Sequence, residues 1–149
     1  MAYPVDKKTQ QPIGRGYMAP GLGNTNSYLV SGVPWITGSA TLGADAEHKI
    51  EFPSITKSVT VIRHDTPSSA DHTLRVHFHS AAIANRVIAG YHFVELDSNE
   101  DSYTFNVKCK EIYLSTPNNG SNREYRVVAE LTHIPTHEMY ALSGSGQTQ

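Results

Sequence analysis

Residues 124–134 read EYRVVAELTHI, a stretch in which apolar and polar side chains alternate. The apolar set on one face comprises Tyr125, Val127, Ala129 and Leu131. The opposite face carries Arg126, Val128, Glu130 and Thr132. A period of two, with one apolar and one largely polar face, is typical of a strand in an antiparallel sheet that covers a core on one side and faces water on the other.

Seven runs upstream have a similar character. The sequence predicts strands over 36–41, 48–52, 58–64, 73–79, 91–96, 102–110 and 111–115. Turn-forming clusters separate several of them, as at 64–69, 97–101 and 116–121. Strand starts recur about every 10–14 residues, which favours a sandwich or barrel over alternating βα units. The predicted fold is an all-β, antiparallel β-sandwich or jelly roll of about eight strands, with a short helix at most over 80–88 and a turn over 135–140.

Two of these runs carry specific predictions about which side chains face the core. Within 73–79, Leu74, Val76 and Phe78 are expected to point inward, and the alternate polar residues to point outward. Within 102–110, the apolar series Tyr103, Phe105, Val107 and Cys109 is expected to face the core. Cys109 is therefore expected to be a small core residue and not a reactive thiol, because buried cysteines are usually inert.

The first 35 residues differ from the rest of the chain. They contain four prolines and five glycines, a density that breaks regular elements, together with scattered aromatic and aliphatic side chains. The sequence predicts three parts: an extended N-terminal arm over 1–35, a β-sandwich domain over 36–140 and a polar C-terminal tail over 141–149. The arm either packs on its own domain or contacts neighbouring subunits. Its candidate interface residues are Tyr17, Leu22, Tyr28, Val30, Pro34 and Trp35.

Composition excludes several classes of protein. The chain has 12 basic and 14 acidic residues, a net charge of −2, without the clustered basic face that binding to nucleic acid or to a membrane surface requires. Cys109 is the single cysteine, so an internal disulfide and a cysteine-based zinc ribbon are excluded. No apolar run approaches the ~18 residues of a membrane span, and residues 1–11 lack the apolar core of a signal peptide. We expect synthesis in a cytoplasm.

The eight histidines raise the hypothesis of a metal site. His77 and His79 lie two apart on one predicted strand, and His92 on a neighbouring strand could add a third ligand. Cupin-type jelly rolls bind metal with such a pair plus a glutamate a few residues on, but no glutamate follows His79 at that spacing. The acidic stretch 97–101 begins like a calcium loop, yet Ser102 and Lys108 replace the expected glycine and glutamate. We expect no metal ligands and no cofactor.

Catalytic motifs are also lacking at the level of sequence. There is no Gly-x-Ser-x-Gly elbow and no glycine loop that opens a helix after a strand. Trp35, the only tryptophan, could be a platform for a carbohydrate, but more often such a residue plugs a core or an interface. We expect a plug, no catalytic residues and no enzymatic activity.

Several phrases of the sequence resemble a known group of proteins. These are PGLGNTNSYLVSGVPWITGS at 20–39, EFP at 51–53, VTV at 59–61, LRVHF at 74–78, IYL at 112–114, VVAELTHIP at 127–135 and SGSG at 143–146. In this order they resemble small virion structural proteins of tailed bacteriophages, most of all jelly-roll capsid decoration (cement) proteins. The resemblance covers most of the chain and rests on the arm–sandwich–tail layout.

The resemblance implies a non-enzymatic protein at the capsid surface of a virion. Its partners would be the major capsid protein and copies of itself, commonly in a trimer, with no nucleic acid, membrane or small-molecule substrate. Arm residues that bridge subunits would stabilise the outer capsid lattice. Two alternatives stay open: a phage tail, neck or fibre component that acts as an adaptor or binds host glycans, and a cupin-like metalloprotein.

Overall fold

The computed structural model describes residues 20–64, 73–81, 86–98, 100–117 and 122–140. Its eight strands are β1 (Val33–Leu42), β2 (Glu47–Glu51), β3 (Thr56–Arg63), β4 (Leu74–His77), β5 (Val94–Leu96), β6 (Ser102–Phe105), β7 (Glu111–Ser115) and β8 (Arg123–Leu131). Three short helices accompany them: α1 (Asn26–Leu29), α2 (Arg86–Ala89) and the 3₁₀ turn η1 (Thr136–Glu138).

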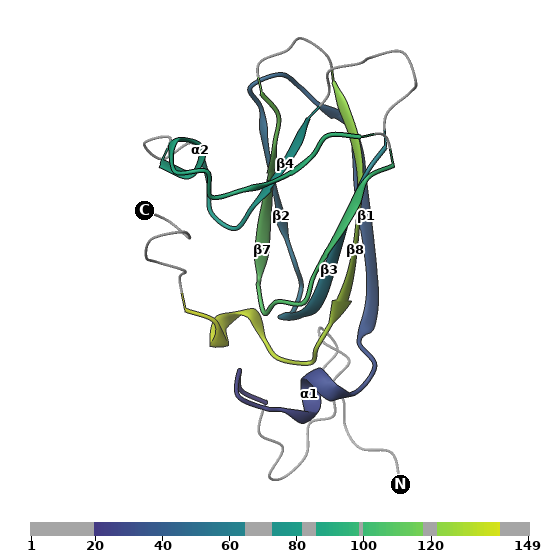
Figure 1. The fold of residues 1–149 in the computed structure, drawn as a ribbon. Coiled ribbons are helices and arrows are strands. Elements are labelled where there is room, and N and C mark those ends of the chain that lie inside the picture. Colours follow the sequence, from purple (N-terminus) through teal and green to yellow (C-terminus); the bar gives the residue numbers. More distant parts are fainter. Residues whose placement is uncertain (1–19, 65–72, 82–85, 99, 118–121, 141–149) are drawn as a thin grey trace, which may run out of the picture.

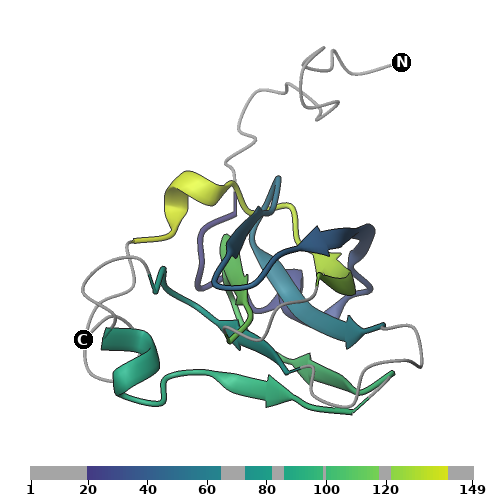
Figure 2. The ribbon, with the colours of Figure 1, turned by 90° about the horizontal axis from the view of Figure 1, so that it is seen from above.

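The strands form two four-stranded antiparallel sheets, in the orders β1-β8-β3-β6 and β2-β7-β4-β5. In four of the pairs the strand numbers add to nine: β1 with β8, β2 with β7, β3 with β6 and β4 with β5. One long antiparallel hairpin, wrapped into two layers, produces these pairs, and this is the jelly-roll arrangement. Figures 1 and 2 show the two layers from the side and from above. The predicted all-β sandwich of eight strands is confirmed.

The predicted faces of β8 are also confirmed. Tyr125, Val127, Ala129 and Leu131 are all buried in the main core, which also receives Val59 and Val61 from β3 and Leu114 from β7. Cys109 is 1% exposed, as expected of a core residue. Trp35 meets Phe52 edge-to-face at a ring distance of 5.2 Å and packs against the same core, so it plugs the sandwich.

Strand β6 ends at Phe105, five residues before the predicted end of its run. Beyond it the chain crosses from one sheet to the other, and the Thr56 side chain replaces the ladder there. The Thr56 hydroxyl donates to the carbonyl of Val107 at 2.8 Å and accepts from the Cys109 amide at 3.1 Å. The crossing was missed because the period of two continues through it in the sequence.

Strand β1 begins at Val33, so the predicted boundary between arm and sandwich at 35/36 falls inside a strand. Pro34 fits there because β1 is an edge strand, where a missing backbone N–H need not cost a ladder bond. β5 begins at Val94, three residues after the prediction, since Tyr91 adopts a left-handed φ of 57° that ends regular extension. Of the helix predicted over 80–88, the structure has only α2, at Arg86–Ala89, and residues 82–85 lie outside the described ranges.

Two predictions of burial are wrong. Tyr103, expected in the core, is 50% exposed on the edge strand β6. His77 was expected on an outward polar face, but its side chain is fully buried, at 0% exposure. It does point away from the core, yet the chain after β4 turns back over it. Phe78 is half-buried and packs edge-to-face on Phe105, with ring centres 5.3 Å apart.

Candidate functional site

The described part of the arm, from residue 20 to the start of β1, lies at one end of the sandwich. Figure 1 shows α1 and η1 at this same end. Here a second, smaller core forms from Ile55, Ile134 and Met139, and the arm adds Leu22 and Tyr28 to it. The arm therefore has its own docking site on the body of the chain.

Two lysines fasten the arm from the body side. Lys108 donates to the carbonyl of Leu22 at 3.0 Å and lies 4.2 Å from the centre of the Tyr28 ring, a cation–π contact. Lys57 donates to the carbonyl of Val30 at 2.9 Å. These contacts attach residues 22–30 to the sandwich domain.

Among the described residues of the arm, three large aliphatic side chains are exposed, and we call them the arm strip. They are Leu29, Val30 and Val33, with exposures of 75%, 57% and 45%. The single helical turn of α1 explains the contrast with Tyr28, because successive helical side chains point about 100° apart. The Tyr28 side chain packs against the small core of the sandwich, and the Leu29 side chain points into solvent.

The candidate interface residues divide accordingly. Val30 and Pro34 are exposed. Leu22 and Tyr28 contact the small core of their own domain, and Trp35 is half-buried against Phe52. Tyr17 lies outside the described residues. Leu29 and Val33 were not among the candidates, although their apolar character beside Val30 and Pro34 in the sequence was a usable signal.

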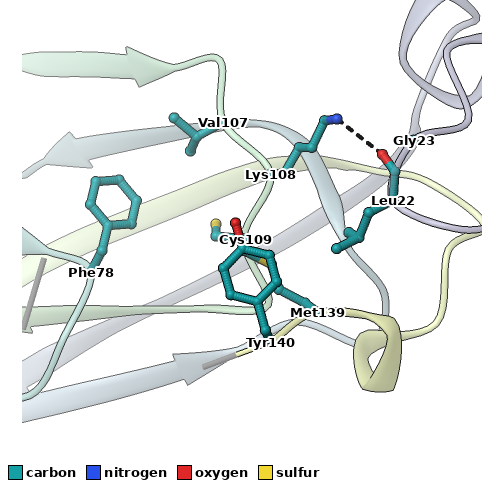
Figure 3. Close-up of a pocket in the computed structure, with 8 residues that line it drawn as sticks. All are labelled: Leu22, Gly23, Phe78, Val107, Lys108, Cys109, Met139 and Tyr140. Carbon is teal, nitrogen blue, oxygen red and sulfur yellow. Dashed lines mark hydrogen bonds between the residues drawn. The ribbon is translucent and has the colours of Figure 1, made fainter. Parts of the chain in front are cut away.

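An open groove of about 590 Å³ lies where the arm meets the sandwich. It is lined by Leu22, Gly23, Phe78, Val107, Lys108, Cys109, Met139 and Tyr140 (Figure 3). Most of these side chains are apolar. The one thiol among them is no nucleophile at neutral pH, because burial raises the pKa of Cys109 to about 11.

A polar cluster centres on His77, on the outer side of the β2-β7-β4-β5 sheet. The His79 carbonyl lies 2.6 Å from His77 Nδ1, and a carbonyl only accepts, so the proton is on Nδ1. Nε2 then accepts from the Ser115 hydroxyl at 2.8 Å. The Tyr113 ring stacks on the imidazole at 6.0 Å, with the two planes 10° apart.

Glu47 binds Ser80 and Ala81, which belong to the segment 78–81 that covers this cluster. Its carboxylate accepts from the Ser80 hydroxyl at 2.6 Å and from the Ala81 amide at 2.7 Å, and lies 3.9 Å from His77 Nε2. Burial lowers the pKa of His77, and the hydrogen bond to His79 and the charge of Glu47 offset part of that effect. Although Ser115 and His77 pair like a nucleophile and its base, Ser115 is 7% exposed, too covered to meet a substrate.

The described residues do not form the metal site that the histidines suggested. Within the described ranges, no three His, Cys, Asp or Glu side chains gather as a metal would require, and both ring nitrogens of His77 already have protein partners. The stretch 97–101 connects β5 to β6, and Asn99 within it lies outside the described residues.

No protein-family model and no curated protein matches the chain. None of the helices in the described segments has the length and apolar character needed to cross a membrane.

Proposed function

We propose that this chain is a non-enzymatic structural protein of a tailed-phage virion, a decoration or cement protein that binds the outer capsid lattice. The observation that carries the proposal is the arm strip, three large exposed apolar side chains beside a segment that Lys57 and Lys108 bind to the sandwich. Exposed contiguous apolar side chains on a fixed segment are typical of protein–protein interfaces.

The jelly-roll strand order supports the same proposal. This architecture recurs in viral capsid proteins and lectins, and also in cupins. The present chain has the wrapped order β1-β8-β3-β6 and β2-β7-β4-β5. Fold alone does not assign function, so the weight rests on the surface.

The energetics of such binding follow from the anchored arm. Burial of the strip on the major capsid protein contributes about 25 cal/mol per Å² of apolar area. Because Lys57 and Lys108 already bind residues 22–30, little further conformational entropy is lost there on binding. Many weak copies on one lattice then add up to a stable shell.

The test is co-sedimentation of the purified full chain with expanded, DNA-free shells assembled from the major capsid protein of the phage that carries it. The wild type should co-sediment and raise the temperature at which the shells fall apart. Leu29→Asp/Val30→Asp should weaken binding by at least ~10-fold, since each carboxylate would be buried without a partner.

Tyr91→Asp is the matched control. Tyr91 is 82% exposed and lies beyond the strip, in the connection from α2 to β5. This variant should bind like the wild type. Equal binding by the strip variant would overturn the proposal, as would a wild type that ignores shells and binds glycans, which is the behaviour of a tail or fibre component.

A further inference from the structure

The outer face of the β1-β8-β3-β6 sheet has a regular pattern of charge. Strand register places Ile36 opposite Val128, Val128 opposite Thr60, and Thr60 opposite Thr104. These four residues form one row across all four strands, which we call the central row. All four side chains are uncharged and β-branched, a type that fits the pleated surface of a sheet.

The rows on either side of the central row carry opposite charges. Arg126 stands two residues before Val128 on β8, in a row with Gly38, Ile62 and Ser102. Glu130 stands two residues after Val128, in a row with Pro34 and Ser58. Both charged side chains are exposed. The row on one side of the central row thus holds a positive charge and the row on the other side a negative one, with Glu124 beside Arg126 and Lys57 near Glu130.

We propose that this face binds the same face of a second copy of the chain, about a twofold axis that runs along the central row. Rotation about this axis brings each central-row residue against its own counterpart, which costs nothing for uncharged side chains. It also brings Arg126 against Glu130 of the second copy, twice, by symmetry. The pattern is self-complementary in this orientation.

The competing orientation is disfavoured by the same charges. A twofold axis parallel to β8 would place Arg126 on Arg126 and Glu130 on Glu130, with repulsion at both. Packed sheets lie about 10 Å apart with strands nearly aligned, a spacing that Ile, Val and Thr side chains can fill.

Arg126 and Glu130 also have partners within their own chain, and both side chains are exposed. Within its own chain Arg126 pairs with Glu124, while Glu130 accepts from Ser58 at 3.1 Å and lies 3.7 Å from Lys57. Exposed pairs of this kind contribute roughly 0–1 kcal/mol each, so pairing across the dimer can replace or extend them. The twofold dimer goes beyond the proposed function and does not depend on it, since it rests on Arg126, Glu130 and the central row and on no side chain of the arm strip.

The experiment is sedimentation velocity of the full chain over a range of concentrations, in low and in high salt. We expect a monomer–dimer equilibrium that weakens as salt rises. Arg126→Glu and Glu130→Arg should each raise the dissociation constant by at least ~10-fold, because each sets like charges against one another. The double variant Arg126→Glu/Glu130→Arg should restore the wild-type constant within ~3-fold.

Asp97→Arg is the control for net charge, because it makes the same change as Glu130→Arg on an exposed residue away from the sheet face. It should dimerise like the wild type, and thermal unfolding should show that every variant is folded. A monomer at all concentrations, a trimer, single variants that still dimerise, or a double variant that does not recover would each overturn the dimer. None of these results bears on shell binding through the arm strip.

Discussion

The two sheets of this sandwich present very different outer faces. On the β2-β7-β4-β5 sheet, the Ser115 hydroxyl is hydrogen-bonded to His77, and Glu47 accepts from Ser80 and from the Ala81 amide in the segment 78–81, which folds back over them. On the β1-β8-β3-β6 sheet, no described segment returns over Val128 or Ile36, and Ile36 is 69% exposed. The polar groups of the first face are hydrogen-bonded within the chain, whereas the second face leaves the large apolar side chain of Ile36 exposed. Strand composition alone does not show this difference, since both faces carry polar residues.

The largest loss of stability should come from removing the buried His77 side chain from the covered outer face of the β2-β7-β4-β5 sheet. His77→Ala should lower the free energy of unfolding by about 3 kcal/mol, because it leaves a cavity and removes the partner of Ser115 and of the His79 carbonyl. Urea unfolding at pH 7.5 measures the loss. A loss below about 1 kcal/mol would mean that this cluster is no more closed than the opposite face.

Acid should weaken the covered face through the same residue. Burial lowers the pKa of His77 below its ordinary 6.5, so the unfolded chain binds a proton that the folded chain resists. The stability supplied by the neutral ring is complete above the unfolded pKa and is lost as pH falls below it. The hydrogen bond to the His79 carbonyl and the charge of Glu47 raise the pKa of His77, whereas the charges of Arg75 and His79 lower it further.

The measurement is the unfolding free energy at pH 7.5 and at pH 5.5, for the wild type and for His77→Asn. The drop on acidification should be smaller in the variant, since the other histidines are common to both chains. Identical drops would show that His77 is not the group responsible.

A smaller loss of stability is expected at Glu47, which binds the segment 78–81 that covers His77. Glu47→Gln should cost about 1–2 kcal/mol, because the amide replaces two charge-assisted hydrogen bonds with weaker ones. Hydrogen exchange at the Ala81 amide should accelerate. Glu51→Gln is the matched control on the same strand, and its side chain, 71% exposed, should leave that exchange rate unchanged.

The smallest effect on folding should come from the open face. Ile36→Ala should change the stability of the monomer by less than ~0.5 kcal/mol, because the side chain is mostly in water. The same variant should weaken the twofold dimer measurably. A large loss of stability in dilute, monomeric protein would show that Ile36 belongs to its own core.

The sequence predicts this fold well wherever a local pattern decides the structure. The alternation in 124–134 places β8 and its buried face, and the prediction for Glu111–Ser115 matches β7 residue for residue. The errors fall where a distant residue decides. Thr56 ends the pairing of β6 by binding at Val107 and Cys109, and Glu47 closes the cover over His77. Neither contact has a local signature.

The candidate surfaces show the same division. The sequence shows which residues of the arm are apolar, but it does not show which of them pack against their own domain. Leu22 and Tyr28 go inward because Ile55, Ile134 and Met139 happen to meet at that end, and Leu29 is left outside. The central row likewise depends on strand register across β1, β8, β3 and β6, which joins residues up to 92 positions apart, Ile36 and Val128.

The jelly-roll order has a consequence for how the chain folds as it is made. β1 pairs with β8 and, within the described strands, with no other, so Val33 must wait for Leu131, 98 residues later, before its ladder closes. During synthesis at about 5–20 residues per second, β1 has no partner for several seconds. Closure of so large a loop is slow, which exposes an unpaired edge to other nascent chains. Pro34, placed near the start of that edge, interrupts the backbone donors along which a stray strand would add.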